Sequence, residues 1–108
     1  MDIARLLQMV GTPRDSAMLR LTLARLLAAD GRVTDALDHL ESAVAMEPGY
    51  TAAWKELGKL RLQQEDRAGA ESAWTRGIEQ SHASGDKQAE KEMTVFLKRL
   101  RKPPPGTA

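Results

Sequence analysis

The chain contains no cysteine among its 108 residues. This absence excludes a disulfide framework, a thiolate zinc site and a cysteine nucleophile, because each of these needs a thiol. The sequence also lacks any apolar run that approaches the roughly 20 residues needed to span a bilayer. Residues 1–7 do not combine a basic start with a long apolar stretch, so they do not have the pattern of a secretory signal. We therefore expect a soluble, cytoplasmic protein.

A marked excess of charge of one sign is lacking as well. Sixteen Lys and Arg residues nearly balance 15 Asp and Glu residues, and the formal net charge is +1. Proteins that bind nucleic acids or membrane surfaces usually carry a basic excess, because phosphates are recognised largely through charge. The basic run at residues 98–102 is typical of a solvated helix end, where cations interact favourably with the helix dipole. We therefore expect neither a nucleic acid nor a membrane among the partners.

Sequence patterns for catalysis and metal binding are missing too. The two histidines, His39 and His82, lie far apart and form no His-Glu-x-x-His arrangement. The sequence has neither a glycine-rich phosphate loop nor a nucleophile elbow. We therefore expect no enzyme activity, no catalytic residue, no metal site and no cofactor.

What the sequence does contain is an internal repeat. Residues 17–48 match residues 51–82 after a shift of about 34 positions, with large residues on large ones and small on small. Matched pairs include Leu23 with Leu57, Leu26 with Leu60, and Ala36 with Ala70. A period of about 34 residues with two helices in each unit is typical of helix-turn-helix solenoids.

Apolar residues recur three and four positions apart, which is the period of amphipathic helices. One such stripe comprises Leu19, Leu23, Leu26 and Leu27, and another comprises Ala89, Met93, Phe96, Leu97 and Leu100. Glycine, Asp-Gly and Pro-Gly positions separate the stripes, and the period-2 alternation of strands is absent. The pattern predicts six helices, at about 2–10, 15–29, 33–46, 51–64, 67–82 and 86–101.

The second repeat resembles the tetratricopeptide repeat (TPR). It carries, in the order of that family, Trp54, Leu57, Gly58, Ala70, Trp74 and Gly77. The first repeat carries at matching places Leu23, Ala24, Ala36, Leu40, Ala43 and Pro48. The resemblance covers residues 17–82 and implies an all-α fold. In this fold, antiparallel helix pairs stack into a short right-handed α-solenoid.

The resemblance also implies the domain organisation, which is a single TPR-like domain over residues 1–102. Two repeats are fewer than the roughly three that usually make a stable stack, so helices that cap the two ends are expected. We expect an N-terminal helix or cap at 1–14, a first repeat at 17–50, a second repeat at 51–84 and a C-terminal capping helix at 85–102. The proline-rich residues 103–108 are expected to form a disordered tail.

Three positions depart from the family pattern. Arg20 stands where the family prefers Trp, Arg61 where it prefers Tyr, and His82 where a Pro usually ends the repeat. Some members hold the carboxylate ends of chaperone tails with a Lys/Asn clamp. Leu21 and Glu56 stand at two positions of that clamp, so we expect no binding of that kind.

Members of this family often bind ligands on a concave surface lined mainly by the first helix of each repeat. By position, the resemblance assigns to this surface Met18, Leu21, Arg25, Lys55, Lys59, Leu62 and Gln63. Arg25, Lys55 and Lys59 would form a basic wall suited to an acidic, amphipathic peptide. The alternative is that these cations only solvate the surface and that Met18 and Leu21 pack under the N-terminal helix. The resemblance implies a protein-interaction module, an adaptor or scaffold that binds a protein or peptide segment without catalysis.

A structural, self-associating module is the alternative function. Two repeats leave apolar faces at both ends of the stack, and the terminal helices of a second copy would complete them. The identity of the partner and the choice between a monomer and a weak homodimer stay open at this point.

Overall fold

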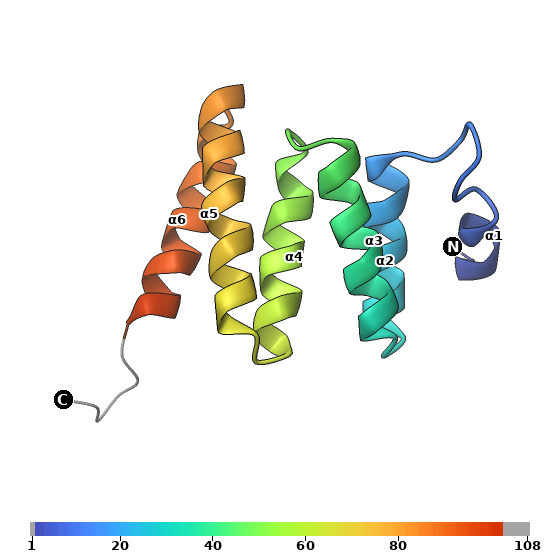
Figure 1. Ribbon diagram of the computed structural model, residues 1–108, viewed down its shortest axis with the longest axis horizontal. Coiled ribbons are helices and arrows are strands. Elements are labelled where there is room, and N and C mark those ends of the chain that lie inside the picture. Colours follow the sequence, from blue (N-terminus) through green and yellow to red (C-terminus); the bar gives the residue numbers. More distant parts are fainter. Residues whose placement is uncertain (1, 103–108) are drawn as a thin grey trace.

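The computed structural model describes residues 2–102, and the regular structure within them is entirely helical (Figure 1). The helices are α1 (Ile3–Leu7), α2 (Ala17–Ala29), α3 (Val33–Met46), α4 (Thr51–Gln63), α5 (Arg67–Ser84) and α6 (Lys87–Arg101). The prediction of an all-α helical repeat fold is confirmed for these residues. The tail predicted at residues 103–108 lies outside them.

Five of the helices begin and end within two residues of their predicted bounds, and α1 differs most. It is shorter than the predicted 2–10, because the chain turns after Leu7 and Gly11 adopts a φ of +79°. This left-handed conformation ends a helix and is accessible to glycine without strain. Helix α5 is longer than predicted and ends at Gly85, whose φ of +78° provides a left-handed C-cap.

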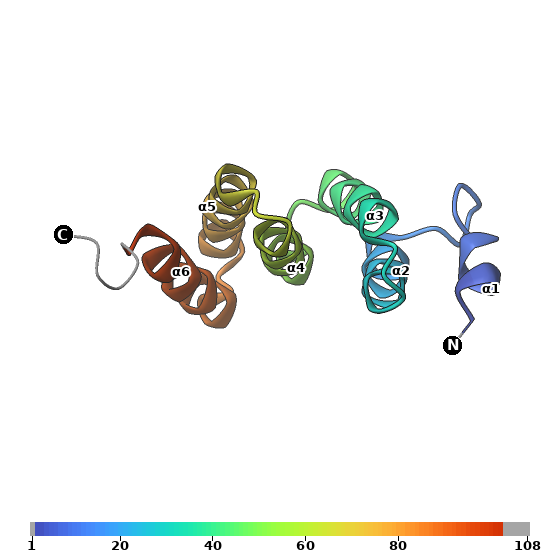
Figure 2. The ribbon, with the colours of Figure 1, turned by 90° about the horizontal axis from the view of Figure 1, so that it is seen from below.

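The helices stack in a single row, each packed against the one before it in the sequence (Figure 1). Figure 2 shows α3 and α5 on one side of this row and α2, α4 and α6 on the other. We call the surface formed by α2, α4 and α6 the A face. Helix α6 contacts both α5 and α4, so it continues the A face beyond α4.

Small residues allow the close helix packing around the two tryptophans. A Cβ atom added to Gly58 would overlap the indole of Trp74, and one added to Gly77 would overlap the side chain of Met93. Trp54 and Trp74 are 4% and 3% exposed, and their indole nitrogens donate to backbone carbonyls. Both tryptophans are therefore packing residues of the core, with their polar atoms satisfied.

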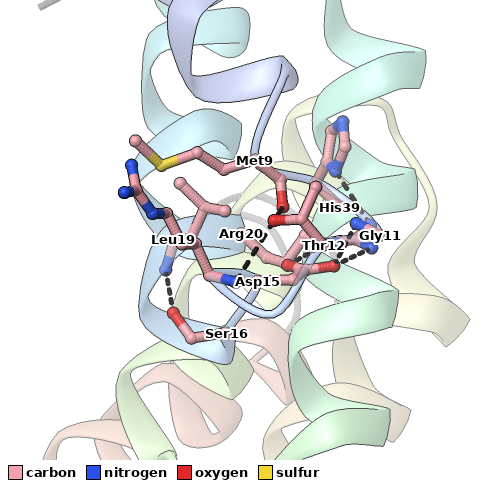
Figure 3. A network of polar contacts seen from close by, with 9 residues as sticks. Met9, Gly11, Thr12, Asp15, Ser16, Leu19, Arg20 and His39 are labelled. Carbon is pink, nitrogen blue, oxygen red and sulfur yellow. Dashed lines mark hydrogen bonds and ion pairs between the residues drawn. The ribbon is translucent and has the colours of Figure 1, made fainter.

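Arg20, one of the departures from the family pattern, lies at the centre of a polar network near the N-terminus. Its Nε and Nη2 atoms donate to the Asp15 carboxylate at 3.0 and 2.8 Å, and its Nη1 atom lies 3.2 Å from Nδ1 of His39 (Figure 3). Asp15 also accepts from the backbone N–H of Gly11 at 2.9 Å. The network therefore ties the segment after α1 to both α2 and α3.

The same contacts change the acidity of two groups in this network. The hydrogen bonds from Arg20 hold the pKa of the Asp15 carboxyl far below its usual range. Burial lowers the pKa of His39, and the nearby charge of Arg20 lowers it further. At neutral pH the network therefore contains an ionised Asp15, a charged Arg20 and a neutral His39.

Arg61, a second departure, connects three helices. Its Nη1 atom donates to the backbone carbonyl of Gly69 at 3.1 Å, and its Nη2 atom donates to Glu41 at 3.0 Å. These contacts link α4 to α5 and to α3. An arginine at this position therefore replaces apolar packing between the repeats with hydrogen bonds.

Candidate functional site

The A face carries two neighbouring pockets. The first lies between α2 and α4 and has a volume of about 180 Å³. It is lined by Ala24, Arg25, Ala28, Leu40, Glu56, Lys59, Leu60 and Gln63. Its lining combines apolar side chains with a paired cation and anion, since Arg25 lies 3.4 Å from Glu56.

The second pocket lies between α4 and α6 and has a volume of about 290 Å³. It is lined by Lys59, Leu62, Arg67, Trp74, Phe96, Arg99 and Leu100. Three cations and no carboxylate line this pocket, so it combines an apolar surface with a positive potential. Lys59 lines both pockets, which places them side by side along the A face.

The three cations of the predicted basic wall all lie on the A face, but each one has a partner there. Arg25 pairs with Glu56, and Lys55 donates to a carboxylate oxygen of Glu92 at 3.0 Å. The hydrogen bond from Lys55 lowers the pKa of the Glu92 carboxyl. The Lys59 ammonium lies 5.3 Å from the ring centroid of Phe96, as in a cation–π contact. The wall is therefore less basic than its lysines and arginine suggest.

Arg99 and Arg67 supply the basic character of the second pocket. Arg67 donates to the backbone carbonyl of Leu100, which fixes its guanidinium at the rim. Arg99 is exposed and forms no ion pair with any other residue in the range 2–102. An anionic group would therefore meet an uncompensated cation here.

One of the predicted surface residues does not lie where the sequence places it. Leu21 is 2% exposed and belongs to the hydrophobic core, so it is not part of the accessible surface. The reason is that α2 is covered by α1 on one side and by α3 on another. Met18 is 67% exposed and lines neither pocket, which also corrects the alternative that it packs under the N-terminal helix.

Comparison with known proteins identifies the family. A family profile described as a tetratricopeptide repeat matches residues 17–60 of the chain. A TPR repeat-containing protein of Pseudomonas aeruginosa is 44% identical over 100 residues, which cover 93% of this chain and 95% of that relative. The chain belongs to the tetratricopeptide repeat family.

Solved structures agree with this TPR assignment. The solution structure of a Bordetella parapertussis protein superposes with a TM-score of 0.76 at 41% identity, covering 93% of this chain and 87% of that one. A TPR domain protein of Salinibacter ruber superposes with a TM-score of 0.79 at 21% identity, covering 91% of this chain and 98% of that one. The second similarity concerns the fold alone.

Within this TPR chain, α6 stands where the first helix of a third repeat would stand. It begins two residues later than a third copy of the repeat requires, because α5 extends to Ser84. The sequence therefore stops matching the repeat after His82, and Phe96 and Arg99 are missed as candidate site residues. The apolar stripe through Phe96, aligned with Leu60 after allowing for two extra residues, is the signal that would have found them.

None of the TPR helices between residues 2 and 102 is long and apolar enough to cross a membrane. Across the same residues, no group of three or more His, Cys, Asp or Glu side chains is arranged to hold a metal ion. His82 is exposed, lies 3.4 Å from Glu90 and lines neither A-face pocket. A larger pocket, of about 670 Å³, lies near the N-terminus and is lined by Arg5, Gln8, Met9, Thr12, Pro13 and Arg14. The two A-face pockets are distinguished by adjoining each other, because Lys59 lines both.

Proposed function

We propose that this TPR protein is a non-catalytic interaction module, an adaptor that binds a segment of another protein on its A face. The observation that supports this most directly is the pair of adjoining pockets that share Lys59. Two pockets in a row suit an elongated segment that places one side chain in each. A compact small molecule would need only one of them.

The second pocket indicates the chemistry of the segment. Its apolar part is formed by Leu62, Trp74 and Phe96, which would bury an apolar or aromatic side chain for about 1.5–3 kcal/mol. Lys59 and Arg99 at the rim would attract a carboxylate close to that side chain. We therefore infer an acidic, amphipathic segment, anchored mainly between α4 and α6. Gln63 and Arg25, at the first pocket, would contact its other end.

A cytoplasmic location, the absence of a cofactor and the absence of catalysis are parts of the same proposal. They follow from an interaction role like that of other repeat modules, whose surfaces bind protein segments. Common divalent metals and nucleotides should leave the melting temperature unchanged. A stabilising shift of several degrees with one of them would point to a bound cofactor instead.

Self-association through the terminal helices is not part of the proposal. In a two-fold pairing of α6 with α6 of a second copy, the exposed Lys91 and Lys98 side chains would face their own equivalents. Burying like charges against each other is costly, because each loses its water without gaining a counter-ion. Sedimentation at micromolar concentration should therefore give the mass of a monomer.

The A-face proposal is tested with a charge-reversed double variant, Lys59→Glu/Arg99→Glu. The matched control is Arg5→Glu/Arg14→Glu, which makes the same charge change at two exposed residues near the N-terminus. A photo-crosslinking residue at Gln63, on the rim of the first pocket, reports contact on the A face in each protein. Circular dichroism checks that all three proteins keep the same helix content.

We expect a small set of proteins to crosslink to the wild type and to the Arg5/Arg14 control, and to be lost with the Lys59/Arg99 variant. Acidic, amphipathic sequences should recur at the crosslinked sites. Crosslinks that persist in the Lys59/Arg99 variant would contradict binding through the second pocket. Crosslinks only to a second copy of the chain would favour self-association instead.

A further inference from the structure

The outward side of α6 carries four lysines in a line. Lys87, Lys91, Lys98 and Lys102 are all exposed, and at about 100° per residue they fall within about 60° of arc around the helix. The buried residues of α6 lie on the opposite side, against the rest of the stack; they are Ala89, Met93, Leu97 and Leu100. We call the four lysines the lysine ridge.

The acidic residues of this helix do not neutralise the ridge. Glu92 pairs with Lys55 of α4, and Glu90 lies 3.4 Å from His82 of α5, a contact that is an ion pair only when His82 is protonated. Asp86 caps the helix by accepting from the backbone N–H of Ala89, and it also accepts from the Thr51 hydroxyl. Among residues 2–102, no carboxylate forms an ion pair with a lysine of the ridge.

The nearly neutral net charge therefore coexists with an uneven distribution of charge over the surface. A formal net charge of +1 arises because acidic residues elsewhere balance the cations of α6. Local charge, and not the total, determines the potential that a bound anion meets within a Debye length of about 10 Å. The end of the stack at α6 is accordingly a positive surface on a nearly neutral protein.

The outward-projecting shape of the lysine ridge limits the kinds of partner that it can bind. The ridge runs along about 22 Å of helix, at about 1.5 Å per residue, and neither α4 nor α5 covers it. It projects outward, so it offers no groove for an extended peptide. Val95 is the one large apolar residue of α6 that is exposed, at 43%, which gives little to insert into a membrane.

A partner that is concave and negatively charged along its rims fits a convex basic ridge. The major groove of B-form DNA has these properties, because it is about 12 Å wide, admits an α-helix and is bordered by phosphates. Because the four lysines lie in one line, they would reach the phosphates along one border of the groove. Lysine is a point charge without the planar, two-pronged donors that read base edges, so its contacts are to the backbone.

We propose that the lysine ridge binds double-stranded DNA through its phosphates, without sequence preference. Such a partner departs from the expectation, drawn from the net charge, that no nucleic acid is bound. Lys91 and Lys98 line neither A-face pocket, so the ridge is a different site from the pockets that the proposed protein segment would occupy.

The test is fluorescence anisotropy with a labelled duplex DNA of random sequence, measured between 50 and 200 mM salt. Each phosphate contact contributes about −0.9 to the slope of log affinity against log salt, so four contacts give about −3.6. The variant Lys91→Gln/Lys98→Gln should lower the magnitude of this slope by about 2 and weaken binding at low salt at least about tenfold. The control Arg5→Gln/Arg14→Gln loses the same charge at the other end of the stack and should bind as the wild type does.

Three results would overturn the proposal. One is the absence of wild-type binding at 50 mM salt, and another is an equal loss of binding in the two double variants. The third is tighter binding to phosphatidylserine vesicles or to polyglutamate than to the duplex, which would assign the ridge to a membrane or to an acidic protein. Circular dichroism shows whether each variant keeps its helix content, so a loss of DNA binding is not mistaken for a folding defect. None of these results decides whether a protein segment binds to the A face.

Discussion

Replacing Asp15 by Asn tests whether the network around Arg20 holds the N-terminal segment onto the repeats. The substitution keeps the size of the side chain but removes the charge that accepts from the Arg20 guanidinium at 3.0 and 2.8 Å. Arg20 then remains a cation in a largely buried position, with His39 as its other side-chain partner. We expect the protein to be destabilised without any change in its helix bounds.

The size of the effect follows from burial. Removing one partner of a fully buried ion pair costs about 3–5 kcal/mol, and a hydrogen bond to a charged group contributes about 1.5–3 kcal/mol. The side chains of Arg20 and Asp15 are 17% and 12% exposed, so water reaches and screens part of the pair. We therefore expect the free energy of unfolding to fall by about 2 kcal/mol, toward the lower end of these ranges.

The assay is urea unfolding followed by circular dichroism at pH 7 and at lower pH. The pKa of Asp15 is lower in the folded protein than the usual aspartate value of 3.8, so the contribution of its charge to stability is complete well above that pH. It is lost progressively as the pH falls below 3.8 toward the folded pKa. The difference between wild type and Asp15→Asn should accordingly shrink under acid conditions.

Asp38→Asn serves as the matched control, because Asp38 is exposed and forms no ion pair within residues 2–102. It should change the unfolding free energy by no more than about 0.5 kcal/mol. The account of the network is refuted if the two variants are equally stable at pH 7. A difference between wild type and Asp15→Asn that stays constant down to pH 2 would refute the assigned role of the carboxylate charge.

Two further predictions concern other parts of the fold. Gly58→Ala should lower the unfolding free energy by about 1–3 kcal/mol, because the added methyl group overlaps Trp74. Gly49→Ala is the control, because a methyl group there meets no atom within 4 Å and should lack this penalty. Equal urea midpoints for the two variants would contradict close packing at Gly58. His39 has a pKa in the folded protein below the usual histidine value of 6.5, so the wild type should lose stability as the pH falls from 6.5 through the folded pKa. His39→Gln should lack this loss in urea titrations between pH 7 and 5, and an unchanged pH dependence would mean that another group titrates.

The sequence predicts helices and core well because both depend on local apolar periodicity. Leu23, Leu57 and Trp74 recur at positions that must be interior in any stack of helix pairs, and all three are buried. The starts of α3 and α4 follow from the Gly and Pro positions that precede them, and the start of α5 follows from its N-cap residue Asp66. The early end of α1 at Leu7 leaves no comparable signal, because the glycine break in the sequence lies four residues later, at Gly11.

The candidate site is predicted less completely, because it depends on neighbours that are distant in the sequence. Lys55 appears as a free cation until α6 brings Glu92 to within 3.0 Å of it. Leu21 appears as a surface residue until α1 and α3 are placed around α2. The second pocket depends on the position of α6, which begins two residues later than a third copy of the repeat requires because α5 extends to Ser84. Each of these depends on tertiary packing, and the spacing within one repeat does not determine it.

The lysine ridge also affects whether a second copy of the chain can stack onto α6. A stack of helix pairs can in principle be extended by another copy, because its last helix presents a surface similar to the one that it covers. Adding a copy onto α6 would require four lysine ammonium groups to lose their water, with no carboxylate nearby to compensate them. The cost of removing water from these lysines therefore opposes the end-to-end association of two copies at α6.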